Sequence, residues 1–308
     1  MNRIQTHVWP AYCRALLASS VASAAERFPG RGEDAPERVH GVRKSLKESR
    51  ALARLFLPSL GEPARVTIAA LAVVRRRVGR ARDLDVMAAR LERLAPPPEV
   101  FGPLVEAIER ERAAAKRAHT SFATAASRAQ LNAIVKRLEG WDLAHVADAD
   151  IAEAVARTYR QGLQRGRIAF DGGDPAALHG LRSRVVDLRY QLSALSPAWP
   201  AALSAQSDEL NALRDTLGDF NDLDVLARFA AERGGPSAEA LAGLTGRLET
   251  KQRKLRHLAE IEFERLFAET PDAFAARLAA YLRRPLGKLE LKRRGLSKPA
   301  EASPSAPA

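Results

Sequence analysis

The stretch from Val39 to Phe56, VHGVRKSLKESRALARLF, decides how this chain folds and where its charge gathers. Apolar or small residues stand at positions 39, 42, 46, 49, 53 and 56, the three-and-four spacing of one helix face. A potential cation follows each of the first five, and these are His40, Arg43, Lys47, Arg50 and Arg54. Because each residue turns a helix by about 100°, the cations border the apolar face instead of lying opposite it. The sequence therefore predicts a helix with a basic stripe beside a packing seam, and it places Lys44 further round, in solvent.

The same pattern returns in the second half of the chain, at Leu178 to Leu195, which reads LHGLRSRVVDLRYQLSAL. At an offset of 139 residues, the difference between positions 179 and 40, three stripe residues return as His179, Arg182 and Arg189. A second motif keeps this offset without an insertion, pairing Asp83-Leu84-Asp85-Val86 with Asp222-Leu223-Asp224-Val225, Gly79 with Gly218, and Arg75 with Arg214. So many matched polar positions indicate two copies of one module of about 140 residues.

The charge balance of the 308 residues points to a polyanionic partner. The chain has 49 Lys or Arg against 37 Asp or Glu, so the formal net charge is +12, and the pI is about 10.4. Arginine outnumbers lysine, which favours bidentate recognition of phosphate or carboxylate. Aromatic residues make up only 6%, which argues against a single-strand reader that stacks bases on a row of rings.

Several other classes of protein are disfavoured by the composition. Cys13 is the only cysteine, so neither a disulfide framework nor a thiolate zinc cluster is expected. The longest apolar run, Val66 to Val74, is far shorter than the roughly 20 residues that span a bilayer, and no membrane partner is expected. The segment Ala15 to Ala25 ends in small residues like a signal peptide, but two serines interrupt it. We expect it to be an amphipathic helix of a cytoplasmic protein.

Periodicity and helix-breaking residues divide the chain into helices, and no stretch shows the sustained period-two alternation of strands. In the first copy the expected helices cover 4–27, the basic helix after Asp34, 64–94 with an interruption near Gly79, 103–118 and 121–139. In the second copy they cover about 151–170, the second basic helix, a long stretch ending at 232, 237–268 and 272–283. We expect an all-α fold of two tandem bundles, with copies at 1–145 and 146–290 and a basic, then disordered tail at 291–308.

The motif His40-x-x-Arg43 on a basic helix, followed by Gly-x-x-x-Asp-x-Asp at 79–85, resembles the conserved histidine α-helical domain (CHAD) family. The second copy carries HGLR at 179–182, LRY at 188–190 and LGDFNDLD at 217–224, and the resemblance spans about residues 5–285. It implies two four-helix bundles related by pseudo-two-fold symmetry, with a basic groove or pore between them. It also implies binding of inorganic polyphosphate, association with polyphosphate granules, no cofactor and no catalytic activity of its own.

We expect the polyphosphate-binding residues on the two basic helices and on helix 151–170, at His40, Arg43, Lys47, Arg50, Arg54, His179, Arg182, Arg189, Arg160 and Arg167. The first stripe is about 21 Å long, which suits a ligand with charge repeated along its length. A solvated charged face is the alternative for each stripe, and for Arg160 and Arg167. The two histidines have three open roles: a donor to phosphate, a packing residue or a metal ligand.

The two copies differ at two positions of the stripe. The family that the chain resembles usually has Lys or Arg at the position of Lys47, where the second copy has Val186. The position of Arg54 is likewise Ser193 in the second copy. Copy one is therefore expected to hold more of the ligand's charge.

Two other functions compete with non-enzymatic polyphosphate binding: a basic helical protein that binds nucleic acid, and a metal-dependent phosphohydrolase that uses the Asp-x-Asp motifs. Residues two apart on a helix differ by about 200°, so Asp83 and Asp85 cannot both face one metal ion. We expect one Asp of each motif to cap a helix or to hold an arginine of the basic helix. No metal site is predicted, and nucleic acid is expected to bind only non-specifically.

Overall fold

In the computed structural model, residues 8–28, 36–77, 80–118, 121–172, 175–233 and 238–283 are described. All regular structure in these ranges is helical, which confirms the predicted all-α class. The helices are α1 (Val8–Arg27), α2 (Pro36–Ala53), α3 (Leu57–Leu60), α4 (Glu62–Arg77), α5 (Arg80–Leu94), α6 (Pro98–Ala118), α7 (Ser121–Glu139), α8 (Asp148–Gly172), α9 (Pro175–Leu195), α10 (Pro200–Arg233), α11 (Ala238–Leu266) and α12 (Pro271–Arg283), with the 3-10 turns η1 (Arg54–Phe56) and η2 (Ser196–Ala198).

Proline marks where many of these helices begin. Helices α2, α6, α9, α10 and α12 each have proline as their first residue. Its fixed φ suits the first helical position, where the missing N–H would have had no partner within the helix. The interruption expected near Gly79 falls between α4 and α5, although Gly79 itself lies outside the described residues, as does the predicted tail at 291–308.

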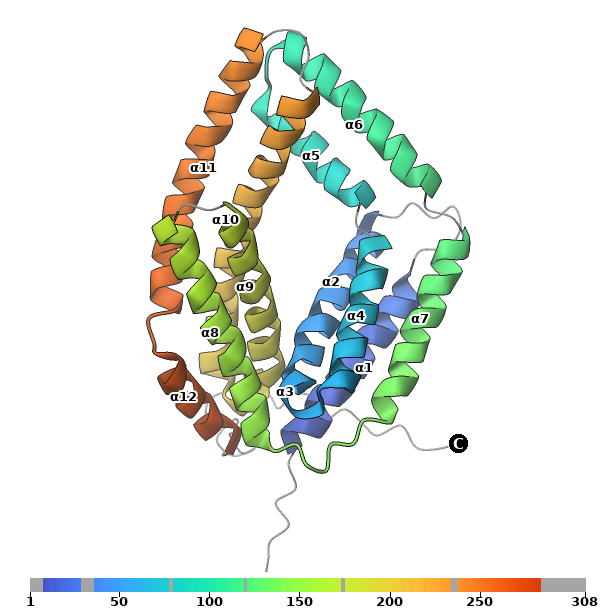
Figure 1. Cartoon of the computed structure of the whole chain (residues 1–308), viewed down its shortest axis with the longest axis vertical. Coiled ribbons are helices and arrows are strands. Elements are labelled where there is room, and N and C mark those ends of the chain that lie inside the picture. Colours follow the sequence, from blue (N-terminus) through green and yellow to red (C-terminus); the bar gives the residue numbers. More distant parts are fainter. Residues whose placement is uncertain are drawn as a thin grey trace, which may run out of the picture.

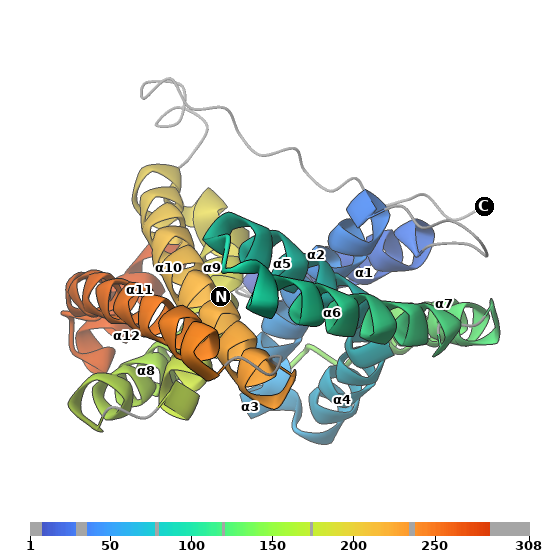
Figure 2. The same cartoon turned by 90° about the horizontal axis from the view of Figure 1, so that it is seen from above.

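The helices form three groups in space. On one side, α1, α2, α4 and α7 pack together, and on the other side α8, α9 and α12 pack with the first half of α10 (Figure 1). An apex stands over both groups and consists of α5, α6, the second half of α10 and the first half of α11. Seen from above, α5 and α6 run together across the molecule beside α10 and α11 (Figure 2). The apex therefore joins helices of both copies.

The two copies can be compared helix by helix at the offset of 139 residues. This offset relates α2 to α9, the two helices that carry the basic stripes. It relates α4 and α5 together to the single helix α10, which runs without a break for 34 residues. The corresponding stretch of copy one consists of two helices, and α5 runs in a different direction from α4 (Figure 1).

Two hydrophobic cores hold the three groups together, and each contains residues of both copies. The larger core includes Leu46 of α2 and Leu181 of α9, both fully buried. The smaller core fills the apex and brings Leu91 of α5 and Leu104 of α6 against Leu226 of α10 and Leu244 of α11. Burying a leucine side chain contributes about 1.5–3 kcal/mol to folding. The copies are thus interlocked, and their description as separate units at 1–145 and 146–290 stays a prediction.

Helices α2 and α9 meet along a seam in the middle of the molecule. Ala51 of α2 packs with Val186 and Tyr190 of α9 in a small buried cluster. The buried side-chain amide of Gln191 donates a hydrogen bond of 3.0 Å to the carbonyl oxygen of Ala51. Val186 therefore occupies the seam itself, which explains why copy two has an apolar residue where copy one has Lys47.

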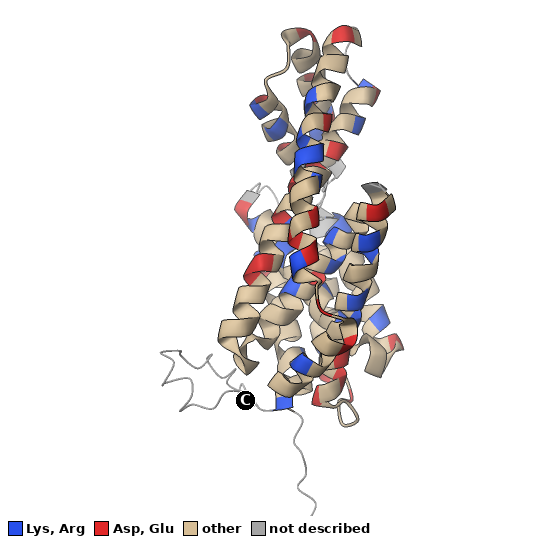
Figure 3. Ribbon diagram, turned by 90° about the vertical axis from the view of Figure 1, so that its left-hand side faces the viewer, with Lys and Arg blue, Asp and Glu red and all other residues tan. Residues whose placement is uncertain are grey.

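The outer surface carries charges of both signs. On the side that shows α8, α11 and α12, basic and acidic residues alternate along the ribbons (Figure 3). No helix in the described ranges is long and apolar enough to cross a membrane.

Candidate functional site

A cavity of about 580 Å³ lies between the two basic helices and is completed by α4, α5 and α10. We call it the central cavity. Its lining residues are His40, Arg43, Lys44, Lys47, Arg75, Asp83, Val86, Met87, His179, Arg182, Arg189, Tyr190, Asn211, Arg214, Asn221, Asp222 and Val225. Seven of them are Lys or Arg and two are Asp, so the lining has a large excess of positive charge.

Equivalent residues of the two copies line this cavity in pairs. The pairs at the 139-residue offset are His40 with His179, Arg43 with Arg182, Arg75 with Arg214, Asp83 with Asp222, and Val86 with Val225. Copy one supplies four of the Lys and Arg residues and copy two supplies three. Copy one therefore contributes one more cation to the lining than copy two. Lys44, which the sequence places in solvent, is one of the lining residues of copy one.

Four arginines that line the cavity each have one hydrogen-bond donor without a partner. The Nε–H groups of Arg75, Arg182, Arg189 and Arg214 are buried and have no hydrogen-bond partner within the protein. A buried donor without a partner costs about 1–3 kcal/mol. The oxygens of an anionic ligand would satisfy these donors with charge-assisted hydrogen bonds, which are stronger than neutral ones.

Packing positions two of these guanidinium groups. The guanidinium carbon of Arg189 lies over the ring of Tyr190, 4.0 Å from its centroid, in cation–π contact. Arg182 lies against Gly218 of α10, where an added Cβ would stand 3.4 Å from Nη2. The glycine repeated at this offset is thus explained in copy two, because it lets the Arg182 side chain lie close to the backbone of α10.

Like charges are crowded around Lys47. Burial first, and then the charges of Arg182, Arg43, Arg214 and Arg75 in that order, together lower the pKa of Lys47 to about 8. These four arginines come from both copies, which places Lys47 at the meeting point of the two stripes. Repulsion among the cations raises the free energy of the unliganded protein, and a bound anion would relieve it.

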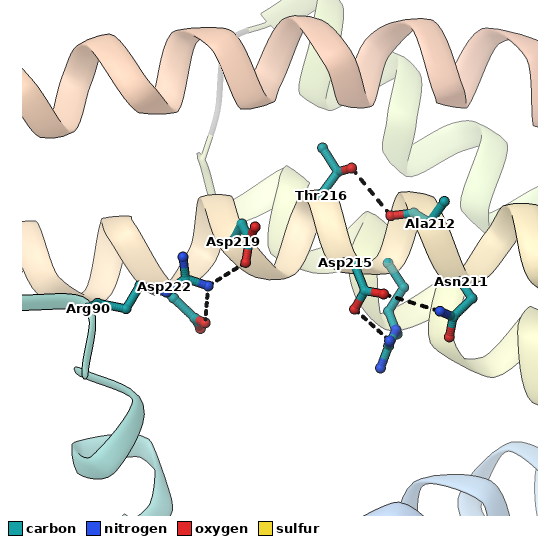
Figure 4. A network of polar contacts seen from close by, with 8 residues as sticks. Arg90, Asn211, Ala212, Asp215, Thr216, Asp219 and Asp222 are labelled. Carbon is teal, nitrogen blue, oxygen red and sulfur yellow. Dashed lines mark hydrogen bonds and ion pairs between the residues drawn. The ribbon is translucent and has the colours of Figure 1, made fainter. Parts of the chain in front are cut away.

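The aspartates of the repeated motif hold arginines, as expected. Asp83 accepts a hydrogen bond of 2.9 Å from Nη2 of Arg43, the arginine of its own copy. Asp222 instead accepts a bond of 3.1 Å from Nη2 of Arg90, which also pairs with Asp219 (Figure 4). The ion pair predicted between a motif aspartate and the basic helix is thus confirmed in copy one.

The second aspartate of each motif points elsewhere. Asp85 pairs with Arg112 of α6, and Asp224 accepts a hydrogen bond of 2.8 Å from Arg228 one turn along α10. Asp83 and Asp85 therefore serve different arginines and do not form a joint pair of carboxylates. Across the described ranges, no three His, Cys, Asp or Glu residues are grouped so that they could hold a metal ion.

Both repeated histidines line the central cavity. A ring nitrogen of His179, Nδ1, lies 3.1 Å from the side-chain oxygen of Asn221, which belongs to the repeated motif on α10. This contact fixes the orientation of the ring. The structure therefore brings both His40 and His179 to the lining of the central cavity.

Two of the predicted stripe residues, Arg50 and Arg54, do not line the central cavity. Arg54 approaches the buried carboxylate of Asp187, with 3.5 Å between its Nε and Oδ2, and Arg184 approaches the same oxygen at 2.8 Å. Arg50 is close to the charges of Arg54 and Arg75, and burial together with these charges lowers its pKa to about 10. Neither Arg50 nor Arg54 is part of the lining, because the stripe passes into the seam there.

The arginines expected on helix 151–170 are not brought to the cavity. Arg160 and Arg167 are exposed on α8, which packs on α9 and α12. Arg160 lies near Glu153 and Asp272, at 3.5 and 3.8 Å. Of the two alternatives stated for these residues, the structure favours the solvated face. The lining instead includes Arg75 and Arg214, whose repeat spacing was the signal that could have placed them in the site.

Comparison with known proteins identifies the relatives of this chain. The profile of the CHAD domain family matches residues 15–231. The fold is similar to that of PptA from Streptomyces chartreusis, with a TM-score of 0.58 and 18% identity, over 84% of this chain and 99% of that one. It is also similar to the CHAD domain from the plant Ricinus communis, with a TM-score of 0.55 and 20% identity, over 90% of this chain and 92% of that one. No curated protein sequence matches. Because the family profile covers well over half of its length, the chain belongs to the CHAD domain family.

Proposed function

We propose that this protein binds inorganic polyphosphate in the central cavity and catalyses no reaction on it. The observation that carries the proposal is the lining itself, in which seven Lys or Arg residues face two Asp and four arginines have buried, unpaired Nε–H donors. Membership of the CHAD family supports the same ligand, since polyphosphate binding is the property that the family resemblance implies.

A linear phosphate polymer matches the chemistry of this lining. Each phosphate unit offers oxygens that accept from guanidinium and ammonium groups, and the negative charge repeats along the chain. The cations of the lining come from four helices, α2, α4, α9 and α10, so they surround a ligand instead of contacting it from one side. Binding would release counterions from the polymer and would therefore weaken steeply as salt increases.

Nucleic acid is the competing ligand, and the lining supports it less well. A reader of single strands stacks bases on aromatic side chains, yet Tyr190 is the one aromatic residue among the lining residues, and Arg189 already covers its ring. The positive net charge of +12 would still attract DNA and RNA without regard to sequence. Non-specific association with nucleic acid is therefore part of the proposal, as is a cytoplasmic location on polyphosphate granules.

The test is a competition experiment at two salt concentrations. Long-chain polyphosphate is expected to displace a fluorescent duplex DNA from the protein. Unlabelled duplex DNA or RNA at the same total concentration of phosphate groups is expected to displace it less. Arg75→Gln combined with Arg214→Gln removes one cavity cation from each copy and should reduce the salt slope of polyphosphate binding by about two. The matched control, Arg160→Gln with Arg167→Gln, removes the same charge from the outer face of α8 and should leave the slope close to that of the parent. Tighter binding to random duplex DNA than to polyphosphate would refute the proposal.

A further inference from the structure

A second basic pocket lies beside the central cavity, between α5, α10 and α11. It has a volume of about 300 Å³, and we call it the flank pocket. Four basic residues line it, Arg90, Arg93, Lys251 and Lys254, together with one acid, Asp219. The rest of its lining is leucine, with no aromatic ring on which a base could stack.

One cluster of ion pairs stands where the two cavities meet. Arg90 of α5 lines the flank pocket and bonds to Asp219, which lines the same pocket. The same Nη2 atom donates to Asp222, which lines the central cavity, at 3.1 Å (Figure 4). Along α5, Arg90 follows Val86 and Met87 of the central cavity by one turn. Arg90 therefore compensates the two carboxylates that would otherwise repel an anion at this boundary.

Three of the four basic residues of the flank pocket have no basic counterpart in the repeat; the fourth, Lys251, corresponds to Arg112 of copy one. At the 139-residue offset, Arg90 and Arg93 of copy one correspond to Phe229 and Glu232 of copy two. Lys254 corresponds in turn to Ala115 of copy one. Duplication of the module therefore does not account for this cluster of cations. The cluster lies on one side of the central cavity, whose own lining consists largely of equivalent residues from the two copies.

We propose that the flank pocket is a second anion-binding site, which takes the part of a linear polyphosphate chain that extends out of the central cavity past Arg90. This inference rests on the proposed function, because it extends the binding site for the same ligand from the central cavity into the flank pocket. Its consequence is a preference for chain length: a short phosphate chain contacts the central cavity alone, and a long chain contacts both cavities.

The experiment compares two ligands on one variant. Lys251→Gln combined with Lys254→Gln removes two exposed cations of the flank pocket without disturbing the ion pairs of Arg90. Titration calorimetry at several salt concentrations would measure the binding of tripolyphosphate and of a polyphosphate of about one hundred units. For the long chain, the salt slope should fall by about two, one for each lysine. For tripolyphosphate, both the slope and the affinity should equal those of the parent within twofold.

The matched control is Lys136→Gln with Arg265→Gln, two exposed cations on α7 and α11 that lie outside both cavities. An unchanged slope for the long chain in the flank variant would overturn the inference and leave the proposed function standing. An equal fall with tripolyphosphate, or in the control variant, would also overturn it, because the lysines would then act through overall charge. A parent protein that binds neither ligand would refute the proposed function itself, and the inference with it.

Discussion

Lys47 lies in the field of four arginines, and its ammonium group is largely removed from water. Its pKa of about 8 in the folded protein is below the ordinary value of 10.5. Between these two values the unfolded chain binds more protons than the folded protein, so stability rises with pH in this window. At pH 7 the charge on Lys47 is present in both states, and the folded protein carries the whole cost of burying it.

We therefore expect Lys47→Met to stabilise the free protein at pH 7 and to weaken polyphosphate binding. The gain in the free energy of unfolding should be about 1–3 kcal/mol at pH 7, and it should shrink between pH 8 and about pH 10.5. Urea unfolding at pH 7 and pH 10 would measure it, with the exposed Lys44→Met as a control that gains little. A loss of stability at pH 7 in Lys47→Met would contradict the crowding of charge described for the central cavity.

Two aspartates that pair with arginines should differ greatly in their effect on stability. Asp83 pairs with Arg43, but the Asp83 side chain is 64% exposed, so Asp83→Ala should cost less than about 1 kcal/mol. Asp187 is 7% exposed, with Arg54 and Arg184 beside it, so Asp187→Ala leaves two arginines without a nearby acid and should cost about 3 kcal/mol or more. Thermal denaturation of both variants followed by circular dichroism would compare them. Equal losses of thermal stability would show that burial does not make the ion pairs of Asp187 more important for stability than that of Asp83.

At the scale of helices, the sequence predicts the elements well and their contacts less well. Periodicity and breakers place the expected helix at 272–283 on α12 and the helix at 121–139 on α7, because each helix shows its own apolar face. Which face packs against which partner is not encoded in one helix. Val186 continues the basic stripe by spacing, but α2 packs against α9 at that point and needs an apolar residue there.

The predicted binding residues follow the same rule. His40, Arg43 and Lys47 line the central cavity, because they precede Ala51, where α2 packs against α9. Arg54 does not, because the stripe continues past Ala51 into the seam. Arg75 and Arg214 come from neighbouring helices, and the repeat pairs them without indicating that α4 and α10 would direct them into the same cavity.

Two glycines of α8 allow close contact with α11 and with Phe267, the residue that follows α11. An added Cβ at Gly166 would lie 2.1 Å from Cε2 of Phe263, and one at Gly162 would lie 2.8 Å from Cε1 of Phe267. Phe263 and Phe267 stack with their ring centroids 4.9 Å apart, so neither ring can move away without disturbing the other.

Gly166→Ala is therefore expected to destabilise the protein by about 1–3 kcal/mol through overpacking. Gly246→Ala provides the control on α11, since no atom lies within 4 Å of its Cβ position. The control should stabilise the helix by up to about 1 kcal/mol, because alanine has the higher helix propensity. Denaturant unfolding would measure the stability of both variants. A Gly166→Ala protein as stable as the parent would show that the rings of Phe263 and Phe267 can move.

For the whole molecule, the repeat in the sequence does not correspond to two independent cores. The apex core joins α5 and α6 of copy one to α10 and α11 of copy two. Trp9 near the start of α1 ties the copies together a second time. Its backbone N–H donates to Asp148 of α8 at 2.9 Å, and its indole N–H donates to the carbonyl oxygen of Leu282 at 3.0 Å. Each copy therefore depends on the other for burial and for hydrogen bonds.

We expect a fragment of residues 1–145 to lack a cooperative unfolding transition when it is produced alone. In this fragment Leu84, Leu91 and Leu104 would lose the α10 and α11 side chains that cover them. Exposing each of them costs about 1.5–3 kcal/mol, and a domain has only about 5–15 kcal/mol of net stability. Co-expression with residues 146–290 should restore both a cooperative thermal transition and a one-to-one complex on size exclusion. The control is the full chain with a protease site inserted at the exposed Ala144, which should stay associated and bind polyphosphate after cleavage. If the fragment of residues 1–145 melts alone as cooperatively as the full chain, the two copies are independent units, and the apex contributes little to holding them together.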